Sequence, residues 1–165
     1  MSIRMIRATE ELPFCLPEGY CAQPFSETAL SSAAAVLFAA GAEFAAECEP
    51  GTLAGATCEV ERYLTYHRQF PSYDAGIHAS TLIIAVDNSP VAVCLIGIDA
   101  GGQPDIYQVA THPLHRRRGL ATAMINRALT VLAADYPTLD LWVNSSSPNR
   151  RLYRGLGFTE TGEVT

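Results

Sequence analysis

Short apolar runs separated by polar turns in the middle of the chain predict a group of β-strands. Residues 81–86 and 91–98 are rich in β-branched side chains, and the Asp-Asn-Ser-Pro sequence at 87–90 is typical of a tight turn. Further strands are predicted at 105–111 and 139–143, each bounded by turn-forming residues. The central segment therefore indicates a strand, turn, strand unit followed by two more strands.

Helical periodicity flanks these strands. One helix is predicted over 26–40, capped by its first serine, and another over 59–70, which ends before a proline. The clearest helix follows Gly119, and a short helix over 148–154 leads to a final strand that starts at Phe158. This order predicts a mixed α/β sheet. The apolar positions after the glycine that show helical spacing are Ala121, Met124, Ile125, Ala128 and Leu132.

The composition excludes several enzyme classes. The chain has 165 residues and no lysine, and its eleven arginines are set against seventeen acids for a formal charge of −6. Phosphate-loop NTPases and protein kinases require a lysine, as do pyridoxal and Schiff-base enzymes. With 48% hydrophobic and 17% charged residues, no internal repeat and no long linker, one globular domain over residues 1–165 is expected.

Charge is divided along the chain. Residues 1–100 hold four arginines and twelve acids, whereas residues 101–165 hold seven arginines and five acids. The first part is therefore suited to attract a cation and the second an anion. A single run of three arginines at 116–118, in a chain of negative net charge, does not indicate nucleic-acid binding.

The number of cysteines and the hydropathy of the chain indicate the cellular compartment in which the protein is expected. The cysteines are odd in number and form no Cys-x-x-Cys pair, which argues against a disulfide framework and a tetrahedral zinc site. They are expected to be reduced, mostly buried thiols, and no metal is expected. Segment 1–11 has no apolar core and the alanine-rich run 33–42 is about half a membrane span, so a cytoplasmic protein without membrane contact is expected. The cysteines are Cys15, Cys21, Cys48, Cys58 and Cys94.

A strand, a basic turn and a helix follow one another over residues 109–122. Free backbone N–H groups and the positive dipole end of the helix meet the three guanidinium groups of 116–118. The small residues Gly119 and Ala121 leave room for a pyrophosphate to approach the backbone. The turn is therefore predicted to bind a phosphate group.

Tyr153 stands on the predicted helix 148–154, near the place to which a ligand of the arginine turn would extend. By itself it is either a packed core tyrosine or a proton donor. Histidines are a further source of acid or base catalysis, although lone histidines are more often structural. The chain has four: His67, His78, His112 and His115.

Taken together, the two segments resemble the GNAT family of acetyl-CoA-dependent N-acetyltransferases. The family's glutamine/arginine-x-x-glycine-x-glycine/alanine signature is met by Arg116-x-x-Gly119-x-Ala121, which follows a typical His-Pro pair at 112–113. The late Leu-Tyr-x-x-Leu-Gly-Phe signature is met by residues 152–158. The two motifs stand in the family's order and separation.

The resemblance covers about residues 80–163 and implies the acyl-CoA N-acyltransferase fold. This fold is α/β, with a mixed, mostly antiparallel central sheet flanked by helices and two splayed strands that form the cofactor cleft. A first strand near residues 20–25 and two helices are expected before the matching part. Acetyl-CoA is implied as cosubstrate, without a metal.

Carried over residue by residue, the resemblance implies how acetyl-CoA is held. The backbone of Val109, Ala110 and Thr111 would pair with the pantetheine arm. Many members contact the cofactor with an asparagine seven residues before the tyrosine, where this chain has Ser146; either this serine or Asn149 would make the contact. The pyrophosphate would lie on the turn formed by Arg116, Arg117, Arg118, Gly119, Leu120, Ala121 and Thr122.

The resemblance also implies catalytic roles. Tyr153 matches the tyrosine that protonates the leaving thiolate in many members, and Asp105 falls where one branch carries its general base, although its Gln-Pro-Asp context also suits a simple turn. A base is required because a primary amine with a pKa near 10.4 must lose a proton before it attacks a thioester. The backbone N–H of Val109 is a candidate donor to the oxyanion.

The sequence therefore predicts an N-acetyltransferase that transfers acetyl to a primary amine of a small molecule or peptide by direct attack in a ternary complex, as a monomer or homodimer. Two alternatives stay open: a noncatalytic acyl-CoA-binding module and a protein N-terminal acetyltransferase. Glu43, Glu47 and Glu49 either attract a cationic acceptor or form a solvated acidic face.

Overall fold

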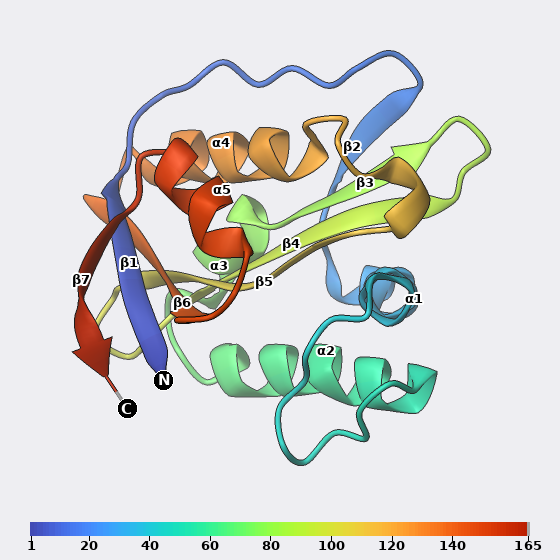
Figure 1. Ribbon diagram of the computed structural model, residues 1–165, viewed down its shortest axis with the longest axis horizontal. Helices are drawn as coiled ribbons and strands as arrows, with labels where there is room; N and C mark the ends of the chain where they lie inside the picture. Colours follow the sequence, from blue (N-terminus) through green and yellow to red (C-terminus); the bar gives the residue numbers. More distant parts are fainter. Residues whose placement is uncertain (165) are drawn as a thin grey trace.

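A seven-stranded sheet runs through the protein, with helices on both faces (Figure 1). The computed structural model describes residues 1–164. The strand order is β2-β3-β4-β5-β6-β1-β7, and only β5 and β6 are parallel neighbours, so the predicted mixed, mostly antiparallel sheet is confirmed. The strands are β1 Ser2–Ala8, β2 Tyr20–Pro24, β3 Thr81–Ala85, β4 Pro90–Ile98, β5 Pro104–Thr111, β6 Thr138–Asn144 and β7 Thr159–Val164.

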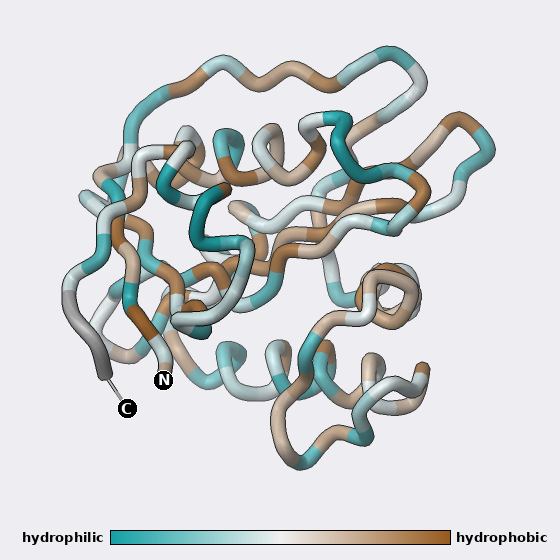
Figure 2. The backbone as a smooth tube through the Cα atoms, viewed as in Figure 1, coloured by the Kyte–Doolittle hydropathy of each residue, from teal (hydrophilic) through white to brown (hydrophobic). Residues whose placement is uncertain are grey.

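Different helices cover the two faces of the sheet. One apolar cluster joins α1 and α2 to β3 and β4, and the other joins α4 and α5 to the opposite face of the central strands. In Figure 2 the hydrophobic stretches gather on the central strands, whereas a hydrophilic stretch stands directly before α4. The helices are η1 Glu27–Ala29, α1 Leu30–Ala40, α2 Leu53–Arg68, α3 Tyr73–Ala79, η2 Pro113–His115, α4 Leu120–Leu132 and α5 Asn149–Gly155.

The N-terminal strand β1 has an inner place in the sheet, between β6 and β7 and antiparallel to both. Ile3 and Met5 are buried, and Arg4 lies between them in sequence with its side chain on the other face. This alternation is the signal of a half-buried strand, but it covers only three residues. The position of β1 depends on pairing with residues of β6 that are 130 or more positions away, which local pattern does not reveal.

Two helices differ from the sequence prediction. α2 begins at Leu53 rather than at residue 59, because the Thr52 hydroxyl accepts a hydrogen bond from the Gly55 N–H at 2.9 Å and caps the helix earlier. After the predicted stop at Pro71 the chain forms one more helix, α3. α3 packs against β4 and α4, so tertiary contacts stabilise a helix too short to form alone.

The expectation of reduced, mostly buried thiols is wrong. Cys48 and Cys58 form a disulfide with a Cα–Cα distance of 5.6 Å, and Cys15 and Cys21 are exposed. Only Cys94 is a buried free thiol among the described residues. The bond forms because the segment after α1 folds back along α2 and brings its cysteine beside that helix, which cysteine count and spacing do not disclose.

None of the helices within residues 1–164 is long and apolar enough to cross a lipid bilayer.

Candidate active site

A cleft opens where β5 and β6 stop pairing. The two strands are paired only at Asp105 with Asp140 and at Ile106 with Leu141. A bulge at Tyr107 interrupts the ladder between β5 and β4 at the same level and turns β5 away from its parallel neighbour. The resulting cavity of about 980 Å³ extends from the separated strands to the N-terminus of α4.

Most residues predicted to hold the cofactor line this cleft. Arg118 and Ser146 are the two predicted cofactor residues that do not. The residues that the cleft brings together are Val109, Ala110, Thr111, Arg116, Arg117, Gly119, Leu120, Ala121, Thr122 and Asn149, with Tyr153 on the same wall.

The turn before α4 has the backbone shape of an anion-binding site. Arg117 has φ +63° and Gly119 has φ +75°, both in the left-handed region, so successive amides around them turn toward one side. No side chain caps the first turn of α4, which leaves its N–H groups free for a ligand. A Cβ at Gly119 would meet nothing within 4 Å, so backbone conformation rather than crowding favours glycine there.

Two of the three consecutive arginines make bonds within the protein. Arg116 donates to the carbonyls of Thr111 and Ala40 at 3.3 and 3.0 Å, which ties the turn to the ends of β5 and α1. Arg118 donates to the Tyr20 hydroxyl at 2.6 Å and lies over the same ring. Arg118 therefore fastens the turn to β2, away from the cleft.

Asn144 is a cleft residue that sequence reasoning missed. Both the N–H and the hydroxyl of Ser146 donate to the Asn144 Oδ1 atom, at 3.0 and 2.8 Å, and Asn144 lines the cleft instead of Ser146. Neighbouring Ser147 also lines it. The family spacing places the asparagine at position 146, but in this chain the cleft is lined by the asparagine at position 144. Only the path of the backbone after β6 reveals this difference.

The Tyr153 side chain is buried, but its hydroxyl has no hydrogen-bond partner among the described residues. Its side chain on α5 is 7% exposed and packs edge-on against Phe158, yet its hydroxyl makes no hydrogen bond within the described residues. Burial raises the pKa of Tyr153 to about 12, and the nearby Cys94 thiol adds to this effect. The phenol is therefore fully protonated at neutral pH, and Tyr153 is part of the cleft lining.

Asp105 lies in a second cavity of about 730 Å³ that shares Tyr107 and Trp142 with the cofactor cleft. Its side chain is half-buried, and its Oδ1 atom is shielded from solvent without a hydrogen-bond partner among residues 1–164. Burial, together with the charges of Asp140 and Asp99, raises the pKa of Asp105 to about 8. With such a pKa, only about one tenth of the groups are ionised at pH 7, and that ionised form is a strong enough base to take a proton from an amine.

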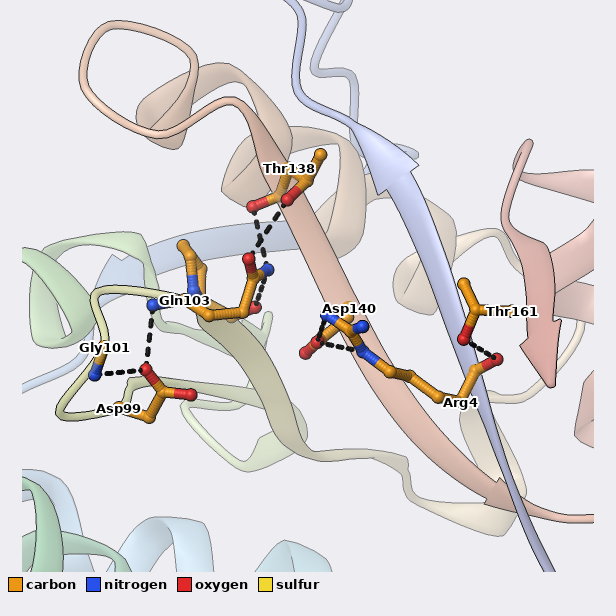
Figure 3. Close-up of polar contacts among 8 residues, drawn as sticks. Arg4, Asp99, Gly101, Gln103, Thr138, Asp140 and Thr161 are labelled. Atoms are coloured by element: carbon orange, nitrogen blue, oxygen red, sulfur yellow. Dashed lines mark hydrogen bonds and ion pairs between the residues drawn. The ribbon is translucent and has the colours of Figure 1, made fainter. Parts of the chain in front are cut away.

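An ion pair between Arg4 and Asp140 partly offsets the effect of burial on the pKa values of the two carboxyl groups. Arg4 from β1 donates to the Asp140 Oδ2 atom through Nε at 2.7 Å and through its terminal nitrogen at 2.6 Å (Figure 3). Burial raises the pKa of Asp140, and the Arg4 guanidinium opposes that rise. The same arginine lowers the pKa of Asp105. The N-terminal strand therefore helps to set the charge state of the candidate base.

A buried glutamate ties the bulge of β5 to the helices. Glu59 of α2, 4% exposed, accepts hydrogen bonds from the Tyr107 hydroxyl at 3.2 Å and from the Gln108 amide at 2.7 Å. Gln108 also donates to the Glu43 carbonyl, and the Ala45 N–H donates to Glu59. This network fixes the segment after α1 against the cleft. The sequence offered no signal for it, since the partners are far apart along the chain.

His67 is a further wall of the second cavity. Its Nδ1–H donates to the Tyr63 carbonyl at 2.8 Å, which leaves Nε2 as an acceptor. The ring lies so close to Gly97 that any Cβ at that position would collide with it, and Gly97 is the cross-strand partner of Asp105. Burial lowers the pKa of His67, so the ring is neutral at physiological pH.

Two further predicted residues, Glu43 and His115, also line the cleft, and His115 hydrogen-bonds the Tyr20 hydroxyl. His112 lies outside both cavities and accepts from the Leu114 N–H. The exposed side chain of Glu47 pairs with Arg62 at 3.5 Å, outside the second cavity. Within residues 1–164, no group of His, Cys, Asp and Glu side chains is arranged to hold a metal ion.

Comparison with known proteins agrees with this architecture. The model of the acetyltransferase (GNAT) family matches residues 34–158, so the chain belongs to that family, whose members are N-acetyltransferases. The resemblance recognised from the two motifs is thereby confirmed. No curated protein sequence matches the chain.

Solved structures with low sequence identity share the fold. A GCN5-related N-acetyltransferase from Sphaerobacter thermophilus is 23% identical with a TM-score of 0.67, covering 97% of this chain and 48% of its own. A putative GNAT acetyltransferase from Novosphingobium aromaticivorans is also 23% identical, with a TM-score of 0.60, covering 96% of this chain and 59% of its own. The chain therefore spans only about half the length of these relatives.

A third solved structure is nearer in length. The ribosomal-protein-S18-alanine N-acetyltransferase from Escherichia coli is 16% identical with a TM-score of 0.62, covering 87% of this chain and 79% of its own.

Proposed function

We propose that the chain is an acetyl-CoA-dependent N-acetyltransferase that transfers acetyl to a primary amine of a small molecule or peptide by direct attack. The observation that carries the proposal is the junction of two cavities. The cleft that holds the anion-binding turn and Tyr153 meets the cavity of Asp105 at Tyr107 and Trp142. A donor of the acetyl group and an acceptor amine can thus approach the same point from opposite sides.

The residues of the cleft fit acetyl-CoA. Free amides at the N-terminus of α4, next to the left-handed Arg117 and Gly119, suit a pyrophosphate. The separated edges of β5 and β6 offer unpaired backbone groups to an extended arm, and we assign this pairing to the segment from Val109 to Thr111. Asn144 and Asn149 supply polar side chains on the opposite wall. Acetyl-CoA supplies a thioester, whose acyl carbon is the electrophile.

The proton-transfer roles follow from the pKa values. Asp105, with a pKa of about 8, accepts the proton that the attacking amine must lose, either directly or through water. Tyr153, with a pKa of about 12, holds its proton at neutral pH and donates it to the departing sulfur. We assign the Val109 N–H to the charge that develops on the acyl oxygen. No cysteine is required, and Cys94 is buried with its pKa raised to about 12.

The test is release of free CoA from acetyl-CoA in the presence of a panel of amines, including a peptide that begins with alanine. Amine-dependent CoA release, with the acetylated amine detected by mass, supports the proposal. Saturable binding of CoA without turnover on any amine would instead identify a noncatalytic acyl-CoA-binding module.

A further inference from the structure

The cavity around Asp105 is lined by more acidic groups than basic ones, and its negative charge grows as Asp105 ionises around its pKa of about 8. Three carboxylates line it, from Asp99, Asp105 and Asp140, against the single guanidinium of Arg4. Both hydrogen bonds from Arg4 go to Asp140 (Figure 3). Asp99 and Asp105 are therefore left without a cationic partner inside the cavity.

Each of these two carboxylates has an oxygen without a donor in the described part of the chain. The Asp99 Oδ1 atom accepts from the N–H groups of Gly101 and Gln103, both at 2.9 Å, whereas its second oxygen accepts none (Figure 3). The Asp105 Oδ1 atom is shielded from solvent and has no partner at all. Buried polar atoms normally find partners, so a bound ligand that donates hydrogen bonds is the natural complement.

Aromatic rings form the walls between these acids. Tyr66 is 51% exposed and Trp142 is 48% exposed, and both lie on the cavity together with Tyr107. Exposed ring faces next to carboxylates attract ammonium groups by cation–π interaction. His67 is uncharged and offers only an acceptor nitrogen, so it does not repel a cation.

The two acids lie at different depths. Asp105 stands opposite Gly97 in the sheet, and Asp99 comes one residue after the end of β4, with its Cα about 7 Å from that of Gly97 if the extended backbone continues. Asp99 is also close enough to His67 to influence it electrostatically, which places it toward α2. Asp105 lies nearer to the shared residues Tyr107 and Trp142, and therefore nearer to the cofactor cleft.

We propose that the acceptor is a primary amine with a second positive charge, a diamine or polyamine, whose reacting nitrogen lies at Asp105 and whose distal ammonium is held by Asp99 beside Tyr66. A chain of four or five carbons bridges the two positions. An acceptor with a carboxylate next to its amine is repelled by the same acids. This inference rests on the proposed acetyltransferase function and adds the class of its acceptor.

The first experiment compares kcat/KM for 1,4-diaminobutane and 1-aminobutane at saturating acetyl-CoA, with the alanine-initiated peptide as a third arm. The diamine should exceed the monoamine by at least tenfold, because only the diamine reaches Asp99. Equal values for both amines, or a preference for the peptide, would overturn the inference while leaving the acetyltransferase function intact.

A matched pair of variants locates the effect. Asp99→Asn preserves the turn cap but removes the charge, so KM for the diamine should rise about tenfold with little change in kcat. Asp87→Asn is the control, because Asp87 also caps a turn, through the Ser89 N–H at 3.0 Å, but lies outside the cavity. A diamine preference that survives Asp99→Asn, or that Asp87→Asn abolishes equally, contradicts the assignment.

Binding can be followed without catalysis. Trp142 is the only tryptophan in the chain, and it lines the cavity, so its fluorescence should change on titration with 1,4-diaminobutane and not with 1-aminobutane. Diamine binding without acetyl transfer would refute the proposed function and keep the inference about the ligand. Absence of both binding and transfer would refute the two together.

Discussion

Replacing Asp105 by asparagine tests the candidate base directly. The free-enzyme pKa of Asp105 is about 8, so at pH 6 only about 1% of the group is ionised. The ratio of wild-type kcat/KM to Asp105→Asn kcat/KM should therefore rise about tenfold per pH unit from pH 6 and level off above pH 8. The plateau ratio is expected at about 10² to 10⁴, the usual contribution of a general base.

The assay is steady-state CoA release from pH 6 to 9, and the ratio cancels the titration of the amine itself. Asp140→Asn is the matched control. It removes a negative charge near Asp105 and leaves Arg4 without its ion-pair partner, so the pH profile of this variant should have its midpoint at lower pH than the wild-type profile. A ratio that is independent of pH would refute the assignment of Asp105 as the base.

The same variant has a consequence for stability. The folded protein raises the pKa of Asp105 far above the unfolded value near 3.9, so the fold favours the protonated form. This contribution is fully present below about pH 4 and is lost as the pH rises through 8. Asp105→Asn should therefore have a higher Tm than wild type at pH 8, with a smaller difference at pH 5; a lower Tm at pH 8 would contradict the argument.

Three other changes have defined outcomes. Tyr153→Phe should lower kcat by about 10² or more with little change in acetyl-CoA affinity, since it removes only the proton donor; undiminished kcat would exclude the tyrosine as the acid. Gly119→Ala places a Cβ on a left-handed residue at a cost of about 1 kcal/mol, and calorimetry should show several-fold weaker CoA binding. Cys48→Ser opens the disulfide to Cys58 and should reduce the free energy of unfolding in urea by about 2.5 kcal/mol, whereas Cys15→Ser, at an exposed free thiol, should have no effect.

The lining of the cleft was accessible to sequence reasoning because most of it is local. The segment 109–122 is one continuous strand, turn and helix, and its shape follows from the residues within it. Tyr153 was accessible for the same reason, as part of the continuous motif at 152–158. Ser146 shows the limit of such reasoning, because the path of a single turn presents Asn144 to the cleft instead.

The cavity around Asp105, the proposed acceptor side, brings together residues from distant parts of the chain. Arg4, Asp105 and Asp140 come from β1, β5 and β6, and their contact exists only because β1 lies between β6 and β7. Tyr66 and His67 join them from α2. Each residue alone is compatible with a solvated surface, so no local pattern distinguishes it.

Short-range periodicity and continuous motifs were enough to predict the family, the class of fold and the turn before α4 as the candidate phosphate site. Only the tertiary structure decided which strand fills the inner place beside β6, that Cys48 meets Cys58, and that the Asp105 carboxyl is shielded beside Asp140. The physical reason is that strand pairing, disulfide geometry and desolvation depend on distances in space between residues that are far apart along the chain.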